Sequence, residues 1–214
     1  RYVMYLIVFI GSSSVFSGSY EDFFIAIKQD DSRTVESLLK RGFDPNARDP
    51  KGFHGLFLAV KEPSPKVAAV LVAWPKTDVE PRTAEDESPL MIASLNGDLE
   101  LARQLVRRGA HVNKPGWTAL HYAATNGHLA VMSFLLEESA YIDAEAPSGA
   151  TPLMMAAHYA TPQSVKLLLD EGADPLLKDR RGLTAIDFAN RANRVESAEL
   201  IATHVRNRQL RGKG

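Results

Sequence analysis

A unit of about 33 residues that repeats along most of the chain predicts an all-α solenoid of about six stacked helix-turn-helix units, joined by β-hairpin-like loops. Each copy starts with a T-P-L-like stretch, continues with apolar residues at helical spacing, and most copies end in glycine. The aligned starting positions are Gly55, Pro89, Ala119, Pro152 and Ala185, which are 34, 30, 33 and 33 residues apart.

The first helix of each copy has a recognisable start. Thr151 is a suitable N-cap, and Pro152 fits the first helical turn because no amide hydrogen is needed there. Ser88 and Pro89 repeat this arrangement. Small residues follow in each of these helices, which allows neighbouring helices to approach closely (Ala123, Ala156, Ala157 and Ala189).

The second helix of each copy shows a buried face followed by a stop signal. Val131, Phe134 and Leu135 lie at helical spacing, as do the corresponding residues of the next copy. Glycine then ends the helix in a left-handed conformation at Gly42, Gly109 and Gly172. Ser139 takes this place in one copy, so we expect mild backbone strain there.

The two upstream copies, residues 20–46 and 52–79, are degenerate. In the first of them, Tyr20, Phe23 and Phe24 predict a core helix and not a cofactor site. We therefore assign residues 19–206 to the repeat array and residues 207–214 to a basic C-terminal tail.

The stretch GWTALHYAATNGH, residues 116–128, resembles the ankyrin repeat family. Thr151-Pro152-Leu153 and Gly172-Ala173-Asp174-Pro175 carry the same resemblance, which covers residues 20–205. It implies a non-catalytic scaffold that binds another protein through its loop tips, called fingers, and through the face of its first, inner helices. It implies no cofactor. The repeats leave no segment of enzyme size in this sequence, so an enzyme or toxin module is disfavoured.

Two histidines in that stretch raise the alternative of a metal or catalytic site. The position of His121 is held by Phe57, Met91, Met154 and Asp187 in the other copies, which argues against shared chemistry. No second histidine lies four residues away, and no carboxylate cluster has metal-site spacing. We therefore interpret His121 and His128 as scaffold residues and predict no metal site and no catalytic residues.

The resemblance identifies the candidate binding residues by position. Trp117 follows the repeat-start glycine, Asn126 ends one inner helix, and His158 with Tyr159 ends the next. These four belong to adjacent repeats, so one shared patch and plain packing against neighbours are both open. Equivalent finger or inner-helix positions add Phe53, Glu87, Leu183 and Arg191. The link Asn113–Gly116 is three residues short, which predicts a notch beside Trp117.

Charge and cysteine content narrow the classes of partner. The 214 residues carry a formal net charge of −1, so we expect no attraction to nucleic acid. We also expect the protein to be a monomer. From Leu176 onward the charge is +5, which indicates either a solvated end of the array or a docking site for an acidic partner. The absence of cysteine excludes disulfides and thiol catalysis.

The first residues predict the compartment. Arg1 precedes the apolar run Val3–Ile10, and Val15-Phe16-Ser17 fits a cleavage site before Gly18. We therefore expect residues 1–17 to be a signal peptide, with no stable membrane insertion after cleavage. The resemblance to short exported bacterial ankyrin proteins implies a periplasmic or secreted protein. The alternative is a membrane-anchored or intracellular regulator or effector that keeps this segment, which is too short to span a bilayer about 30 Å thick.

Overall fold

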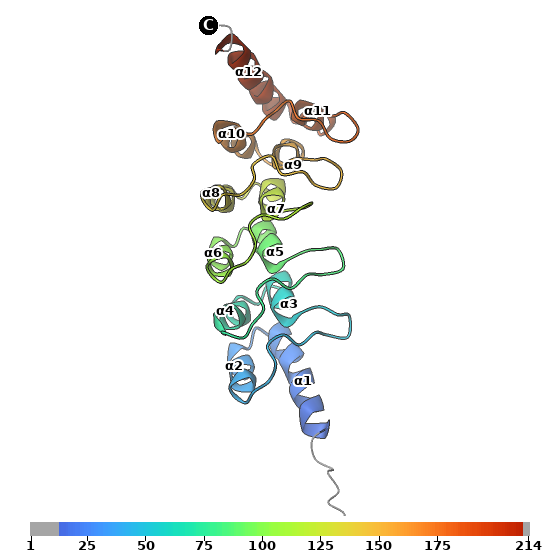
Figure 1. Cartoon of the computed structure of the whole chain (residues 1–214), viewed down its shortest axis with the longest axis vertical. Helices are drawn as coiled ribbons and strands as arrows, with labels where there is room; N and C mark the ends of the chain where they lie inside the picture. The colour runs from blue at the N-terminus through green and yellow to red at the C-terminus, as the bar shows by residue number, and fades with distance from the viewer. Residues whose placement is uncertain (1–12, 212–214) are drawn as a thin grey trace, which may run out of the picture. The chain divides into compact units, whose positions relative to one another are not determined.

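The computed structural model describes residues 13–211, and side chains from residue 18 to residue 210. This part of the chain contains twelve α-helices and one isolated β-bridge, with no β-strand, as the repeat pattern predicted (Figure 1). The chain forms two compact units, Arg1–Asp78 and Val79–Gly214, which we call the N-terminal unit and the C-terminal unit.

The N-terminal unit packs four helices in two layers. Helix α1 (Ser13–Lys28) lies beside α3 (Gly55–Lys61), and α2 (Ser32–Lys40) lies beside α4 (Pro65–Ala73). The predicted first core helix is confirmed, because Phe23 is fully buried and its ring centroid lies 4.8 Å from that of Phe43. A side chain at Gly55 would approach the ring of Phe23 to 2.7 Å, so glycine is needed where α1 and α3 touch.

The C-terminal unit continues the same alternation of inner and outer helices. The inner helices pack side by side: α5 (Pro89–Asn96), α7 (Ala119–Asn126), α9 (Pro152–Tyr159) and α11 (Ala185–Arg191). The outer helices form the second layer: α6 (Leu99–Arg107), α8 (Leu129–Glu137), α10 (Pro162–Asp170) and α12 (Val195–Arg211). Figure 1 shows the loops projecting beyond the inner helices.

The predicted helix starts and stops are present. Thr151 and Ser88 accept hydrogen bonds from the amides of Met154 and Met91, each three residues into its helix. Ala123 and Ala156 are fully buried, as their position between neighbouring helices requires. Ser139 has a φ of 63°, which confirms the expected strain, because this region disfavours any residue with a Cβ.

A series of side chains links consecutive repeats and was missed at the sequence level. In the N-terminal unit Asn46 Oδ1 accepts the amide of Asp78 at 2.8 Å. In the C-terminal unit the same contact recurs between Glu80 and the amide of His111 (3.2 Å), between Asn113 and Tyr141 (2.8 Å), and between Asp143 and Asp174 (3.1 Å). We call this series the acceptor ladder. Its members are two Asn, one Glu and one Asp, so no sequence identity reveals it.

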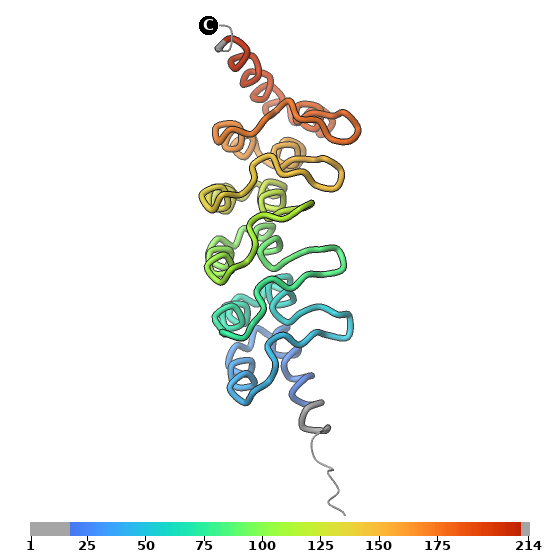
Figure 2. Tube along the Cα trace, in the orientation of Figure 1, coloured from blue at the N-terminus to red at the C-terminus, as the bar shows by residue number. Residues whose placement is uncertain are grey.

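The fingers are hairpin-like turns held by a carboxylate. Asp49 accepts the amides of Lys51 and Phe53, and Arg48 forms a bridge with His54. Asp179 makes the same turn in the last finger by accepting the amides of Arg181 and Leu183, each at 2.9 Å. The loop that links α6 to α7 projects less far than the other fingers of the C-terminal unit, as its shorter sequence predicts (Figure 2).

The last helix runs past one predicted boundary. Helix α12 continues through residues 207–211, which the sequence pattern assigned to a basic tail. The reason is local: no glycine or proline occurs between Val195 and Arg211, and Gly212 follows. At the other end α1 begins at Ser13, and residues 1–12 of the predicted signal peptide lie outside the described part. Within that part, no helix has the length and apolar character needed to cross a membrane.

Candidate functional site

His121 joins two repeats of the C-terminal unit. Its Nδ1 accepts the amide of Thr118 at 3.2 Å, and its Nε2 donates to the carbonyl of Ala150 at 3.0 Å. The ring is fully buried, and burial lowers its pKa from 6.5 to about 4. Both ring nitrogens are therefore engaged by the scaffold, which confirms the structural interpretation of this histidine.

The end of α7 is tied to the end of α5. Nδ2 of Asn126 donates to the carbonyl of Leu95 at 2.8 Å, and Nε2 of His128 shares that carbonyl at 2.9 Å. A side chain at Gly97 would lie 2.5 Å from the ring of His128, so the close approach needs glycine. Asn126 is exposed but already held, which presents its amide group in a fixed position.

The end of α9 repeats this arrangement and adds an exposed aromatic ring. Nδ1 of His158 lies 3.2 Å from the carbonyl of Phe188, on α11. Tyr159 packs edge-on against His158, with 4.3 Å between ring centroids, yet 53% of the residue is exposed. Arg194 donates to the Tyr159 carbonyl at 3.1 Å, which fixes the backbone beneath the ring. Tyr159 is thus a held but largely uncovered aromatic.

Trp117 is less exposed than its position suggested. Its ring is half-buried and lies edge-on to His121 and to Tyr122, with centroids 5.3 Å and 6.4 Å away. It precedes α7, whereas Asn126 ends this helix, and eight helical residues span about 12 Å. The four-residue patch therefore divides: Asn126, His158 and Tyr159 lie at the far ends of the inner helices, and Trp117 lies at the finger end.

Lys114 connects the loop at the predicted notch beside Trp117 to the preceding finger. Its Nζ lies 2.5 Å from a carboxylate oxygen of Asp86 and donates to the carbonyls of Pro115 and Trp117 at 2.9 and 3.0 Å. The hydrogen bond from Lys114 lowers the pKa of the Asp86 carboxyl. Lys114 therefore connects the short finger to Asp86 of the preceding finger.

Glu87 occupies the base of another finger. Its Oε1 accepts the hydroxyl of Tyr122 at 3.0 Å. Burial raises the pKa of the Tyr122 phenol, and the neighbouring Glu87 carboxylate raises it further. Glu87 is half-buried, and this hydrogen bond links the start of α5 to α7.

Leu183 and Arg191 belong to the last repeat. Leu183 is half-buried, and its amide is held by Asp179, whose carboxylate also pairs with Arg181 at 2.8 Å. Arg181 in turn lies over the ring of Phe188, 5.5 Å from its centroid. Arg191 is exposed at the end of α11. The backbone of Leu183 is therefore part of the finger turn, whereas the charged side chain of Arg191 is exposed.

Phe53 lines a hollow in the N-terminal unit that sequence reasoning did not foresee. The cavity, about 410 Å³, is lined from α1, the finger and α3, with an apolar wall and three lysines (Phe24, Lys28, Asp49, Pro50, Lys51, Phe53, Leu58, Lys61 and Glu62). Phe53 stacks on Phe57, and Lys61 Nζ lies 5.0 Å from the Phe53 centroid. This volume is within the range of ligand pockets. Only the finger position of Phe53 could have indicated it.

The described residues contain no group of three or more histidine or carboxylate side chains that could hold a metal ion. The polar groups described above are engaged in helix starts, finger turns and contacts between repeats. The arrangement therefore consists of fixed, partly apolar surfaces at finger and inner-helix positions that a ligand could contact.

Comparison with known sequences supports the repeat architecture described above. Sequence families described as ankyrin repeats match residues 23–115 and 56–146 (three copies) and residues 137–189 (many copies). The mouse nuclear factor NF-kappa-B p105 subunit is 32% identical over 68% of this chain and 16% of its own length. An ankyrin repeat-containing protein of Treponema pallidum is 28% identical over 81% of this chain and 49% of its own. The chain thus spans half or less of these relatives.

Two solved structures share the fold over nearly their whole length. One is a chain in the structure of the predatory endopeptidase Bd0816 and the immunity protein Bd3460, a complex from Bdellovibrio bacteriovorus. It has a TM-score of 0.74 and 28% identity, and the match covers 86% of this chain and 97% of that chain. The other is an ankyrin repeat domain from Acinetobacter baumannii, with a TM-score of 0.74, 27% identity, and 85% and 96% coverage. With family matches that span residues 23–189, this chain belongs to the ankyrin-repeat family.

Proposed function

We propose that this protein is an exported, non-catalytic scaffold that binds another protein through its finger and inner-helix positions. Tyr159 is the observation that carries the proposal. The residue is 53% exposed although its backbone is fixed, and the matching inner helices α5 and α7 end in Asn96 and Asn126 instead. Folding therefore does not require an aromatic there, and an exposed rigid aromatic is the usual kind of binding hot spot.

A capture experiment with matched variants tests this function. The full chain, Tyr159→Ala and Tyr141→Ala serve as baits in extracts of the compartment where the protein resides. Tyr141 is the control, because it is 68% exposed but lies in the loop after α8. We expect one protein to be retained by the first and third baits and lost from Tyr159→Ala. Equal retention by all three baits would remove Tyr159 from the interface.

A second candidate narrows the partner to an endopeptidase of the same compartment. This narrower proposal is supported by the similarity of the fold to one chain in a complex of an endopeptidase with an immunity protein. The match covers 97% of that chain. We expect the wild-type chain to suppress a peptidase activity in the extract and Tyr159→Ala to suppress it less. If no peptidase activity changes and the bait retains some other protein, the endopeptidase proposal is excluded. The general scaffold function would still stand.

Export is the part of the proposal that concerns residues 1–17. Their basic, apolar and small-residue order supports cleavage before Gly18 or a near neighbour. N-terminal sequencing of the protein from fractionated cells tests it. An intact Val3–Ile10 segment recovered with the membranes would favour the anchored alternative.

A further inference from the structure

The acceptor ladder stops at the last loop of the C-terminal unit, where an apolar side chain takes the place of the acceptor. Glu80, Asn113 and Asp143 each accept an amide from the next repeat, and the residue at the matching place 33 positions after Asp143 is Leu176. Leucine cannot accept a hydrogen bond, and 54% of Leu176 is exposed. A further polar repeat could not dock here as the others do.

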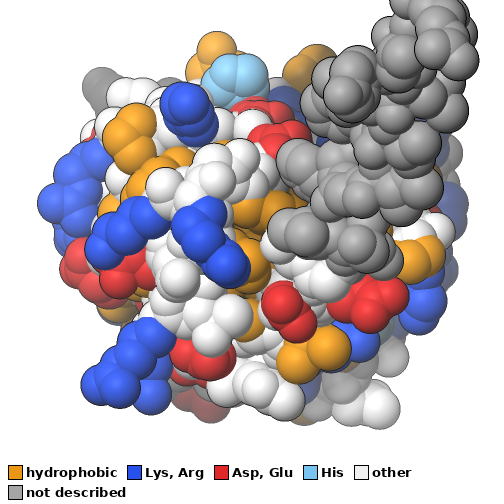
Figure 3. Space-filling model, turned by 90° about the horizontal axis from the view of Figure 1, so that it is seen from below, with side chains coloured by type: hydrophobic (Ala, Val, Ile, Leu, Met, Phe, Trp, Pro, Cys, Tyr) orange, Lys and Arg blue, Asp and Glu red, His pale blue; other side chains and the backbone are white. Residues whose placement is uncertain are grey.

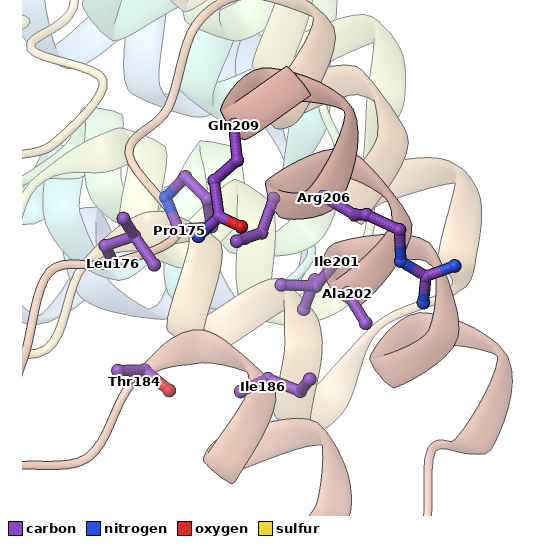
Figure 4. A pocket seen from close by; sticks show the side chains of 9 residues that line it. Pro175, Leu176, Thr184, Ile186, Ile201, Ala202, Arg206 and Gln209 are labelled. Carbon is purple, nitrogen blue, oxygen red and sulfur yellow. The ribbon is translucent and has the colours of Figure 1, made fainter. Parts of the chain in front are cut away.

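Leu176 instead borders an apolar trough. A cavity of about 330 Å³ lies between the last loop, the start of α11 and α12 (Figure 4), and its lining is mostly aliphatic (Pro175, Leu176, Thr184, Ile186, Ile201, Ala202, Val205, Arg206 and Gln209). A second cavity of about 220 Å³ shares Pro175, Leu176, Val205 and Gln209 with it and adds Asp174 and Arg208. Together the two cavities form one elongated feature, which we call the terminal trough.

The terminal trough lies where the stack of helices has no further neighbour in the described chain. Helix α11 packs against α9 and α12, and α12 packs against α10 and α11. Helix α12 has 17 residues, whereas each of the other outer helices has nine, so it extends the trough along its length. Its trough-lining residues Ile201, Val205 and Gln209 recur every four positions and lie on one side of the helix.

The rim of the terminal trough is positively charged. After Glu199 the described part of α12 contains no acidic residue, while Arg206 and Arg208 are both exposed. Arg208 Nη1 lies 3.4 Å from Asp174, and the Arg206 side chain extends away from the apolar residues (Figure 4). On the face shown in Figure 3, by contrast, basic and acidic side chains are interspersed. The trough therefore combines an apolar floor with two arginines and one carboxylate, Asp174, so the net charge at its rim is positive.

We propose that the terminal trough binds an acidic amphipathic helix of a partner protein. Such a helix would place one or two large apolar side chains in the trough, lie along α12, and set its carboxylates against Arg206 and Arg208. This surface is separate from the end of α9, so it does not rest on the function proposed for Tyr159.

The probe is a fluorescent helical peptide of about 18 residues, or five helical turns, with leucines along one face and glutamates elsewhere. A second peptide has lysine in place of every glutamate. Binding of each to the full chain is measured by fluorescence anisotropy. We expect saturable binding of the acidic peptide and binding of the basic peptide that is at least tenfold weaker.

Two variants and one control locate the binding. Leu176→Asn should weaken the acidic peptide at least tenfold. Arg206→Glu should weaken the acidic peptide and strengthen the basic one. Leu129→Asn is the control, because Leu129 is 40% exposed at the start of α8, away from the trough-lining residues, and should change neither affinity. Denaturation curves of the three variants establish that each is folded.

Three results would overturn the proposal. The first is equal affinity for both peptides, or peptide binding that Leu176→Asn leaves unchanged. The second is a wild-type dimer in sedimentation that Leu176→Asn dissociates, which would make a second copy of the chain the occupant. The third is retention by phosphatidylglycerol vesicles that Arg206→Glu abolishes, without saturable peptide binding.

Discussion

Replacement of His121 by glutamine should make the stability of the C-terminal unit less sensitive to acid. The folded protein keeps this ring neutral, because burial lowers its pKa to about 4, whereas the unfolded chain titrates it near 6.5. Below pH 6.5 the unfolded state therefore binds more protons, and the stability contributed by neutral His121 is lost as the pH falls from about 6.5 to about 4.

The size of this effect follows from the two pKa values. The unfolding free energy should fall by about 2 kcal/mol at pH 5 and by about 3 kcal/mol at pH 4 from this group alone. At pH 7 the variant should be less stable than wild type by roughly 1–2 kcal/mol, because the bonds to Thr118 and Ala150 are disturbed. The gap should close or reverse by pH 5.

Urea denaturation of both proteins between pH 7 and pH 4.5 measures the difference. Other titrating groups, including His54, whose pKa burial also lowers to about 4, are common to both proteins and cancel in the comparison. A gap that stays constant across this range would refute the reasoning. Stoichiometric zinc binding that disappears in the variant, with little change in stability, would mean that His121 is a ligand and not a scaffold residue.

Two further predictions concern backbone and finger stability. Ser139→Gly should raise the unfolding free energy by about 0.5–1 kcal/mol, because glycine adopts a φ of 63° without the Cβ penalty. A thermal melt measures this change. A melting midpoint that is unchanged or lower in the variant would contradict the prediction. Lys114→Ala should lower the unfolding free energy by about 1–2 kcal/mol, because two carbonyls lose a charged donor and Asp86 keeps only its longer contact with Arg82. Urea denaturation measures this change, and wild-type stability in the variant would contradict it.

Local sequence signals were enough to predict most of the fold. The caps at Ser88 and Thr151, the buried alanines and the strain at Ser139 each depend on one residue type meeting one backbone requirement. The acceptor ladder was not predictable in this way, because Asn, Glu and Asp supply the same oxygen from different side chains.

The candidate site was predictable only as a set of positions. Tyr159 is as exposed as its place at the end of α9 suggested. Trp117 is not, because its ring packs edge-on against His121 and Tyr122, and Lys114 beside it pairs with Asp86. The Trp117 ring contacts α7, whereas Lys114 contacts Asp86 and its own loop, and spacing along the chain does not report the direction of either side chain.

The affinity of Tyr159→Ala for the captured partner tests the central claim most directly. Calorimetric titration of wild type, Tyr159→Ala and the control Tyr141→Ala should show a loss of about 2 kcal/mol or more for Tyr159→Ala alone, a weakening of roughly thirtyfold. The unfolding free energy should change by under about 0.5 kcal/mol, because the ring is largely exposed. Unchanged affinity in a folded Tyr159→Ala protein would contradict the claim that this surface binds the partner.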